Sequence, residues 1–378
     1  MKKGNKNRMM IAVLVVLVLI LLAEILIWMK GVRQKQEDEE EVESTEVVST
    51  IEEESSEINT EEESSETETE TAQEVFYPEP KYQFQTEEIV VEVPNITKEY
   101  TVAWVSDLHM VTDHETSDDI LAEDLDAVKI RYDFFQTPDG VHGEDLLPEV
   151  IDFLNYGTYD GIIFGGDMLD YCSVSNMEKL TSEFARLNKK VPVLYIRADH
   201  DYGFWYGGEG FTETDAENMH KEMEDGDNLY DKYLDFGEFV ILGVNRSTKD
   251  MFPEQYSILD EMFVSAASEG KPVIVATHVP YASQVDDTNE VTLYDRSIEI
   301  RNKIYYWGGG NYVPNDVTTN FLNNIYKEDT SVVEVLAGHL HGSWDGNLTE
   351  QVRQHIFEPA YLGSVGIIRF VPEDEGDE

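Results

Sequence analysis

The stretch VPVLYIRADHDYG, residues 191–203, decides the kind of fold, because an apolar run ends abruptly in Asp199, His200 and Asp201. A short run of Val, Leu, Tyr and Ile bounded by proline and glycine is typical of a buried strand. Such a strand normally passes into a turn of Gly, Asn or Ser. Two carboxylates around an imidazole therefore indicate that the end of this strand carries chemistry.

The same kind of short apolar run returns along the chain. These runs are rich in β-branched residues without long-range alternation, as expected of strands covered on both faces. Residues 175–190 and 255–270 have apolar side chains at helical spacing and predict helices, and residues 354–371 predict closing strands. We therefore predict a layered α/β domain. The other strand runs are EYTVAWVSDLH (99–109), YDGIIFGGDMLD (159–170), EFVILGVNRS (238–247), PVIVATHVPY (272–281) and VVEVLAGHLHG (332–342).

Five of these strands end in acids or histidines of the kind that bind metals. Any one motif alone is a weak signal, because a single histidine after a strand usually has a structural role. Together they favour one site, since loops at the carboxyl ends of strands in an α/β sheet meet at one crevice. Mixed carboxylate and imidazole ligands suit Mn, Fe or Zn better than Ca or Mg. The residues are Asp107, His109, Asp167, Asp199, His200, His278, His339 and His341.

In two of the motifs the candidate ligands are separated by one residue, which supports a pair of metal ions. In Asp107-x-His109, alternate residues of an extended chain point to the same side, so that both side chains can flank one ion. His339 and His341 have the same spacing. Two such pairs predict two neighbouring metal positions.

The blocks SDLH (106–109), GGDMLD (165–170), RADHD (197–201), THVP (277–280) and GHLH (338–341) resemble the ordered motifs of the calcineurin-like metallophosphoesterase superfamily. The resemblance spans residues 107–341 of a predicted domain at 81–372. It implies a four-layer αββα sandwich with a dinuclear centre of Mn, Fe or Zn ions, either both divalent or of mixed valence. In that scheme Asp167 bridges both ions. The first ion is held by Asp107, His109 and His341, and the second by Asp199, His278 and His339.

The resemblance also implies an activity and two catalytic residues. Phosphate monoesters or diesters would be hydrolysed by a water that the two ions convert to hydroxide. His200 matches the histidine that stabilises the developing oxyanion or protonates the leaving oxygen. Asp170 matches the acid that orients this histidine, with a helix-start cap as the alternative role.

The motif around Asp199 departs from the family pattern. The family usually has Gly-Asn-His, whereas this chain has Ala198-Asp199-His200. Oxygen ligation survives the change from Asn to Asp, but the amide donor is lost and a negative charge is added. We expect tighter metal binding and weaker attraction for a phosphate dianion. Either a more highly charged metal pair or a preference for phosphodiesters would follow.

Two segments, residues 110–159 and 281–330, are longer than in the simplest members of the family. Aromatic and basic residues near the motifs are candidates for substrate contacts, with loop packing and surface ion pairing as the alternatives. The candidate substrate-binding residues are Arg246, Tyr202, Trp205 and Tyr281.

Charge limits the partners of the chain. The net charge of −51 excludes nucleic-acid polymers, which are bound by clustered Lys and Arg. Residues 37–74 carry eighteen of the acids and no Lys or Arg, so most of the excess lies elsewhere. Cys172 is the one cysteine and excludes an internal disulfide.

The N-terminal sequence predicts a membrane anchor. Residues 9–29 supply about the 20 apolar residues that a membrane span needs, and a cleaved signal peptide is the alternative. The basic residues 1–8 favour a cytoplasmic tail, which places the domain outside the membrane, as in a bacterial envelope. Residues 30–80 predict a disordered acidic stalk, and residues 373–378 a short acidic tail.

Two functions from different classes fit these observations. The first is a membrane-anchored, extracytoplasmic phosphoesterase. The second is a non-catalytic surface protein that binds glycan or envelope polymer on a degenerate phosphoesterase fold, and Asp199 favours it. Retention of both His200 and Asp170 favours the enzyme, because a structural metal site would not need that pair.

Overall fold

The computed structural model describes residues 77–112, 120–223, 232–245, 251–285 and 315–373. Among the helices in these ranges, none combines the length and apolar composition that a membrane span requires. The predicted anchor at 9–29 and the tail at 1–8 lie outside the described residues, as do most residues of the predicted stalk and of the acidic C-terminal tail.

The first sheet has five strands in the order β1-β11-β2-β3-β4. Neighbouring strands are parallel except for β11 and β2, which are antiparallel. The parallel run β2-β3-β4 matters for function, because it brings the carboxyl ends of three strands to one edge. The strands are β1 (Gln85–Val93), β2 (Tyr100–Val105), β3 (Gly161–Gly165), β4 (Val193–Ile196) and β11 (Ser364–Pro372).

The second sheet has six strands in the order β5-β6-β7-β8-β10-β9. Its four inner strands are parallel, and both outer pairs are antiparallel. Both sheets are therefore mixed. The strands are β5 (Tyr233–Asp235), β6 (Val240–Val244), β7 (Val273–Thr277), β8 (Val332–Ala337), β9 (Trp344–Asn347) and β10 (Arg353–Ile356).

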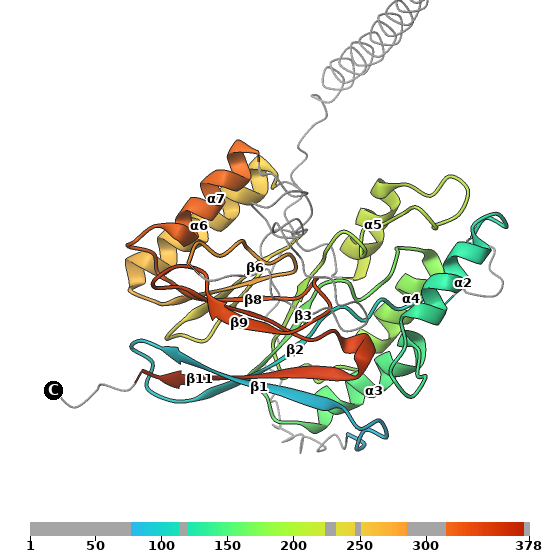
Figure 1. The fold of residues 1–378 in the computed structure, drawn as a ribbon, viewed down its shortest axis with the longest axis horizontal. Coiled ribbons are helices and arrows are strands. Elements are labelled where there is room, and N and C mark those ends of the chain that lie inside the picture. Colours follow the sequence, from blue (N-terminus) through green and yellow to red (C-terminus); the bar gives the residue numbers. More distant parts are fainter. Residues whose placement is uncertain (1–76, 113–119, 224–231, 246–250, 286–314, 374–378) are drawn as a thin grey trace, which may run out of the picture. The chain divides into compact units, whose positions relative to one another are not determined.

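Three apolar layers hold the domain together. Trp104 and Ile163 of the first sheet pack with Ile241 and Ile274 of the second, which forms the layer between the sheets. The outer layers lie under α3 (Gly143–Tyr156), α4 (Val174–Phe184) and α5 (Glu213–Met223) on the first sheet, and under α6 (Pro253–Glu269) and α7 (Asp316–Tyr326) on the second. Figure 1 shows the sheets stacked between these helices, so the predicted four layers are present.

The predicted strand runs and helices are confirmed, with differences at their ends. The run 191–203 forms β4 only over its first part, and the helix predicted at 175–190 ends at Phe184. Local chemistry explains the boundaries of these helices. The Ser173 side chain accepts a hydrogen bond from the main-chain N–H of Asn176 at the start of α4. α6 begins at Pro253, and Gly270 caps its C-terminal end with a φ of 69°, the left-handed value that favours glycine.

The segment 110–159 contains two helices, α2 (Leu125–Phe134) and α3. Leu146, Val150 and Leu154 of α3 are fully buried in the outer layer of the first sheet. Part of this long segment is therefore core, whereas α2 reaches the site described below.

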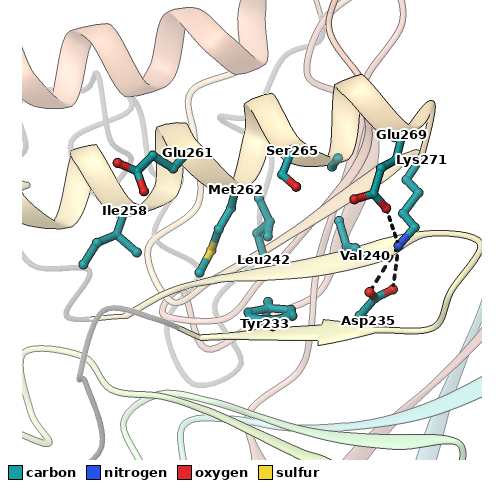
Figure 2. Close-up of a pocket in the computed structure, with 11 residues that line it drawn as sticks. Tyr233, Asp235, Val240, Leu242, Ile258, Glu261, Met262, Ser265, Glu269 and Lys271 are labelled. Atoms are coloured by element: carbon teal, nitrogen blue, oxygen red, sulfur yellow. Dashed lines mark hydrogen bonds and ion pairs between the residues drawn. The ribbon is translucent and has the colours of Figure 1, made fainter.

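A pocket of about 580 Å³ lies between α6 and the edge strand β5 (Figure 2). At one end the Lys271 amino group pairs with Asp235 at 3.1 Å and with Glu269 at 2.9 Å. Tyr233, Leu242 and other residues of β5, β6 and α6 complete its lining, and no predicted metal ligand is among them.

Candidate metal centre

The predicted ligands follow the carboxyl ends of β2, β3, β4, β7 and β8, and they meet between the two sheets. The His278 Nε2 atom, after β7 of the second sheet, lies 2.9 Å from Asp167 Oδ2, after β3 of the first. The main-chain N–H of His339, after β8, donates to the Asp107 carboxylate at 3.0 Å. The edges of the two sheets therefore form one site.

Left-handed backbone turns aim these side chains inward. Of the six non-glycine residues with positive φ in the described ranges, five are predicted ligands. Each such residue costs about 1–3 kcal/mol, and strain of this kind gathers at functional sites. This finding corrects the expectation that the Asp-x-His pair lies on an extended chain, because both of its residues are left-handed and lie beyond the end of β2. The five are Asp107 (55°), His109 (47°), Asp167 (52°), His339 (73°) and His341 (52°).

Two glycines of the motifs make room for the ligands. A Cβ atom at Gly166 would lie 2.6 Å from the His278 Nδ1 atom. One at Gly338 would lie 2.4 Å from Asp107 Oδ2. The glycines in GGD and GHLH are therefore needed for close packing around the centre.

The first group of donors consists of Asp107, His109 and His341, whose ligand atoms all lie within 4.8 Å of one another. The Nε2 atoms of His109 and His341 face each other at 2.9 Å. The His341 Nε2 atom lies 3.4 Å from Asp107 Oδ1. This is the set that the resemblance implies for the first ion.

The second group contains Asp167, Asp199, His278 and His339, again within 4.8 Å. The His278 Nδ1–H donates to the Gly165 carbonyl at 2.8 Å, which sets Nε2 as the ring nitrogen that faces the carboxylates. Asp167 also belongs to a group with His109 and His200, and its Oδ2 lies 3.7 Å from His109 Nε2. Asp167 thus lies between the two groups, where a bridging ligand is needed.

The charges of this site fit cations. The Asp199 Oδ1 atom is buried without a hydrogen-bond partner in the described part of the chain, which is costly for a carboxylate. Burial and then the charge of Asp167 raise the pKa of Asp199. Burial alone would lower the pKa of His278, yet Asp167 and Asp107 raise it to about 10. A field strong enough to hold a proton on a buried imidazole also attracts metal cations.

His200 lies next to this centre. Its Nδ1–H donates to the main-chain carbonyl of Asp170 at 2.7 Å, and its ring meets the ring of Trp205 edge-on at 5.5 Å. Burial opposes protonation of His200, but the carboxylates, Asp167 first, raise its pKa. His200 therefore lies beside the predicted ligands, with its Nδ1 engaged by the Asp170 carbonyl.

Asp170 contacts His200, the predicted partner, but its carboxylate has two closer partners. Its carboxylate binds His109 Nδ1 at 3.1 Å and lies 3.5 Å from His200 Nδ1. It also receives a bidentate hydrogen-bond pair from Arg131, with Nη2 at 2.6 Å from Oδ1. The alternative role as a helix cap is wrong, because Ser173 caps α4.

The second carboxylate of the opening motif is structural. Asp201 is fully buried and accepts hydrogen bonds from the main-chain N–H groups of Asp167 (2.8 Å), Ala198 (2.9 Å) and Leu169 (3.1 Å). The Tyr195 hydroxyl donates to it as well, at 3.1 Å. Asp201 thus ties the loop after β4 to the loop after β3. The two carboxylates around His200 therefore have separate tasks, one toward the metals and one toward the backbone.

The candidate substrate contacts divide into three cases. Trp205 is 48% exposed beside His200, which is compatible with a contact. Tyr281 is fully buried in the outer layer of the second sheet, and Tyr202 is buried against His220, so both predictions are corrected. Arg246 lies outside the described residues.

Arg131 and Phe135 are site residues that the sequence did not suggest. The Phe135 ring stacks on His109 with centroids 4.1 Å apart and planes at 11°. Arg131 reaches Asp170 from α2. Arg131 lies at the end of α2 and Phe135 directly after it, but nothing local in the sequence indicated which surface this helix covers.

Two mixed sheets with groups of candidate metal ligands at their strand ends are the arrangement expected of a metal-dependent hydrolase. The family model described as calcineurin-like phosphoesterase matches residues 100–343. The chain belongs to this family and is a metal-dependent phosphoric ester hydrolase. The family uses dinuclear metal centres, and this chain has candidate metal-ligand residues at its strand ends.

The solved structures that match the chain share little sequence with it. A dimetal phosphatase from Danio rerio is 11% identical with a TM-score of 0.42, and the match covers 70% of this chain and 89% of that one. TT1561 of Thermus thermophilus is 12% identical with a TM-score of 0.37, covering 70% and 91%. The phosphopantetheinyl hydrolase from Mycobacterium tuberculosis is 13% identical with a TM-score of 0.37, covering 75% and 100%. No curated protein matches the chain.

Proposed function

We propose that the chain hydrolyses phosphate monoesters or diesters at two metal ions. The first ion would be held by Asp107, His109 and His341, and the second by Asp199, His278 and His339, with Asp167 between them. The meeting of the two donor groups at Asp167, with His200 adjacent, is the observation that carries this proposal. Mn, Fe or Zn fits the mixture of imidazole and carboxylate donors.

Two bound divalent ions of this kind lower the pKa of a water and polarise a phosphoryl oxygen. The chain's own part of the reaction belongs mainly to His200. Because its Nδ1 is committed to the Asp170 carbonyl, Nε2 is the ring nitrogen that can reach a substrate oxygen. The nearby carboxylates, Asp167 first, raise the pKa of the His200 imidazole, which favours the protonated form that can donate to the oxygen that leaves.

The charge at Asp199 bears on the substrate. Three carboxylates would bring three negative charges to two divalent ions, those of Asp107, Asp167 and Asp199. With the Asn of the family pattern at position 199, the site would have two such charges. A dianionic monoester is repelled by this extra charge more than a monoanionic diester. We therefore propose a preference for diesters, unless one of the ions carries a higher charge.

We also propose that the chain is anchored in a membrane through residues 9–29, with residues 1–8 in the cytoplasm and the catalytic domain outside. The apolar length of this segment and its basic N-terminal flank support the proposal. Protease treatment of intact cells tests it. A domain that is digested only after the cells are opened would refute the outside location.

The catalytic proposal is tested with the purified full-length chain and generic chromogenic monoesters and diesters in the presence of Mn. We expect His200→Gln to reduce kcat by about 10²–10⁴-fold while the metal content stays unchanged. His142→Gln is the matched control, because His142 lies on the ring of Tyr132 and outside all three donor groups. A wild-type chain that binds metal but turns over neither ester class would instead support the non-catalytic surface-binding function.

A further inference from the structure

Helix α2 brings two side chains to the metal centre from outside the strand-end motifs. Arg131 lies in the last turn of α2, and Phe135 is the residue that follows the end of the helix. Val128, one turn before Arg131, is fully buried. In Figure 1 α2 lies on the same side of the domain as α3 and α4. The face of α2 that carries Val128 is therefore turned toward the protein and not toward solvent.

Arg131 binds Asp170, and Asp170 in turn binds His109. Its guanidinium makes a two-point contact with Asp170, a geometry that fixes the orientation of a carboxylate better than a point charge does. Asp170 is fully buried, and its Oδ1 atom lies 3.1 Å from His109 Nδ1. The chain of contacts thus runs from α2 through one carboxylate to one predicted metal ligand.

Phe135 fixes the plane of the same imidazole. It stacks on the His109 ring at 4.1 Å, and Tyr361 packs edge-on against Phe135 at 5.2 Å. The Arg131 guanidinium lies 5.4 Å from the centre of the Phe135 ring. Held at Nδ1 and across one face, His109 keeps Nε2 directed at His341, 2.9 Å away.

The second donor group has its own support. His278 is held by the Gly165 carbonyl at 2.8 Å, and the backbone under Asp167 is held by Asp201 at 2.8 Å. None of the contacts given above for Arg131 and Phe135 involves Asp199, His278 or His339. Support from α2 is therefore directed at one of the two metal positions.

We propose that α2 sets the metal affinity of the first position, with Arg131 as a positioning residue that acts through Asp170 and Phe135 as the wall of the His109 ring. The inference rests on the proposed dinuclear function. Loss of an outer partner of a ligand typically lowers metal affinity about 10–100-fold. Substitution of Arg131 or Phe135 should therefore lower the metal affinity of the first position and leave that of the second unchanged.

The test compares full-length Arg131→Met, Arg131→Lys and Phe135→Leu with the wild type by Mn titration calorimetry on metal-free protein. Arg131→Met should weaken one of two Mn sites about 10–100-fold and leave the other unchanged. Arg131→Lys keeps the charge but loses the two-point contact with Asp170. Phe135→Leu keeps the apolar volume but loses the stacking on His109. Both should therefore weaken the same Mn site, but less than Arg131→Met does. Arg186→Met is the control, because Arg186 pairs with Glu183 and Asp152 instead.

Turnover supplies a second measurement. In Arg131→Met the Mn concentration for half-maximal activity should rise about 10–100-fold, whereas kcat at saturating Mn should recover most of the wild-type value. Unchanged affinity at both sites, or equal weakening of both, would overturn the inference. If Arg131→Met does not fold, as judged by its circular dichroism melt, Arg131→Lys and Phe135→Leu decide. A wild-type chain that binds fewer than two Mn ions would instead refute the dinuclear function itself.

Discussion

His200 is oriented by the main-chain carbonyl of Asp170, 2.7 Å from its Nδ1 atom, and not chiefly by the carboxylate of that residue. The carboxylate lies 3.5 Å from the same nitrogen and is occupied by His109 and Arg131. A main-chain acceptor is kept in every substitution at position 170. The orientation of the catalytic imidazole is therefore separated from the support of the first metal position.

Asp170→Asn should accordingly act on metal binding more than on proton transfer. The carbonyl that holds His200 remains, but the charge that pairs with Arg131 and the acceptor for His109 are altered. We expect the half-saturating Mn concentration to rise at least tenfold, with kcat at saturating Mn reduced by less than about tenfold. Steady-state assays over a range of Mn measure both. A loss of kcat as large as that of His200→Gln, not relieved by Mn, would show that the carboxylate itself orients His200.

Asp201→Asn should destabilise the domain. The buried carboxylate accepts from three main-chain N–H groups and from the Tyr195 hydroxyl. An amide would turn its own NH₂ toward two of these donors, at a cost of roughly 2–4 kcal/mol in the free energy of unfolding. Urea unfolding of metal-free protein measures the change. Asp235→Asn, which removes an exposed pair with Lys271, is the control and should cost less than about 1 kcal/mol. Equal stability of the two variants would contradict the structural role of Asp201.

The sequence predicted the centre of the fold and the ligand positions well, for a physical reason. Inner strands such as β3 and β7 are buried on both faces and stand out as continuous apolar runs. Predicted ligands follow them closely, with Asp167 after β3 in a left-handed conformation and His278 directly after β7, so the chemistry marks the strand ends. Edge strands lack this signal, and β1 was missed because its exposed and buried positions alternate in the polar sequence QTEEIVVEV.

The contribution of α2 could not be predicted in the same way. α3 had a usable signal, since Leu146, Val150 and Leu154 recur at helical spacing, although Pro148 interrupts the run. α2 has a weak apolar face with Val128 as its one buried residue, so its placement depends on tertiary contacts. The pairing of Arg131 with Asp170 is a product of that placement. Charge and spacing alone did not distinguish it from a surface ion pair.

Stability of the metal-free domain should fall as pH rises from about 5 to 8, and Glu334 should be a cause. This carboxyl on β8 is buried, and burial raises its pKa to about 8 from its ordinary value of 4.5. Below pH 4.5 the group is protonated in both states, so folding carries no penalty. Between the two pKa values only the unfolded state ionises, and stability is lost progressively. Glu334→Gln mimics the protonated acid and should remove roughly 3–5 kcal/mol of this loss. Urea unfolding at pH 5 and pH 8 with chelator present measures the free energy of unfolding of both proteins. If the wild type and Glu334→Gln lost the same stability between the two pH values, the assignment would be contradicted.

Asp199→Asn should shift the preference between ester classes. The substitution keeps an oxygen ligand but removes one of three carboxylate charges at the centre, which favours a dianionic monoester over a monoanionic diester. A difference of about 1.4 kcal/mol corresponds to tenfold, so we expect the ratio of kcat/KM for monoester to that for diester to rise roughly tenfold. Metal affinity should fall at the second position, and assays therefore need saturating Mn. Asp160→Asn is the control, since Asp160 accepts from the Thr101 N–H in an exposed position. If the ratio stays at the wild-type value while two Mn ions remain bound, the charge of Asp199 does not select the substrate, and the diester preference has no basis in this centre.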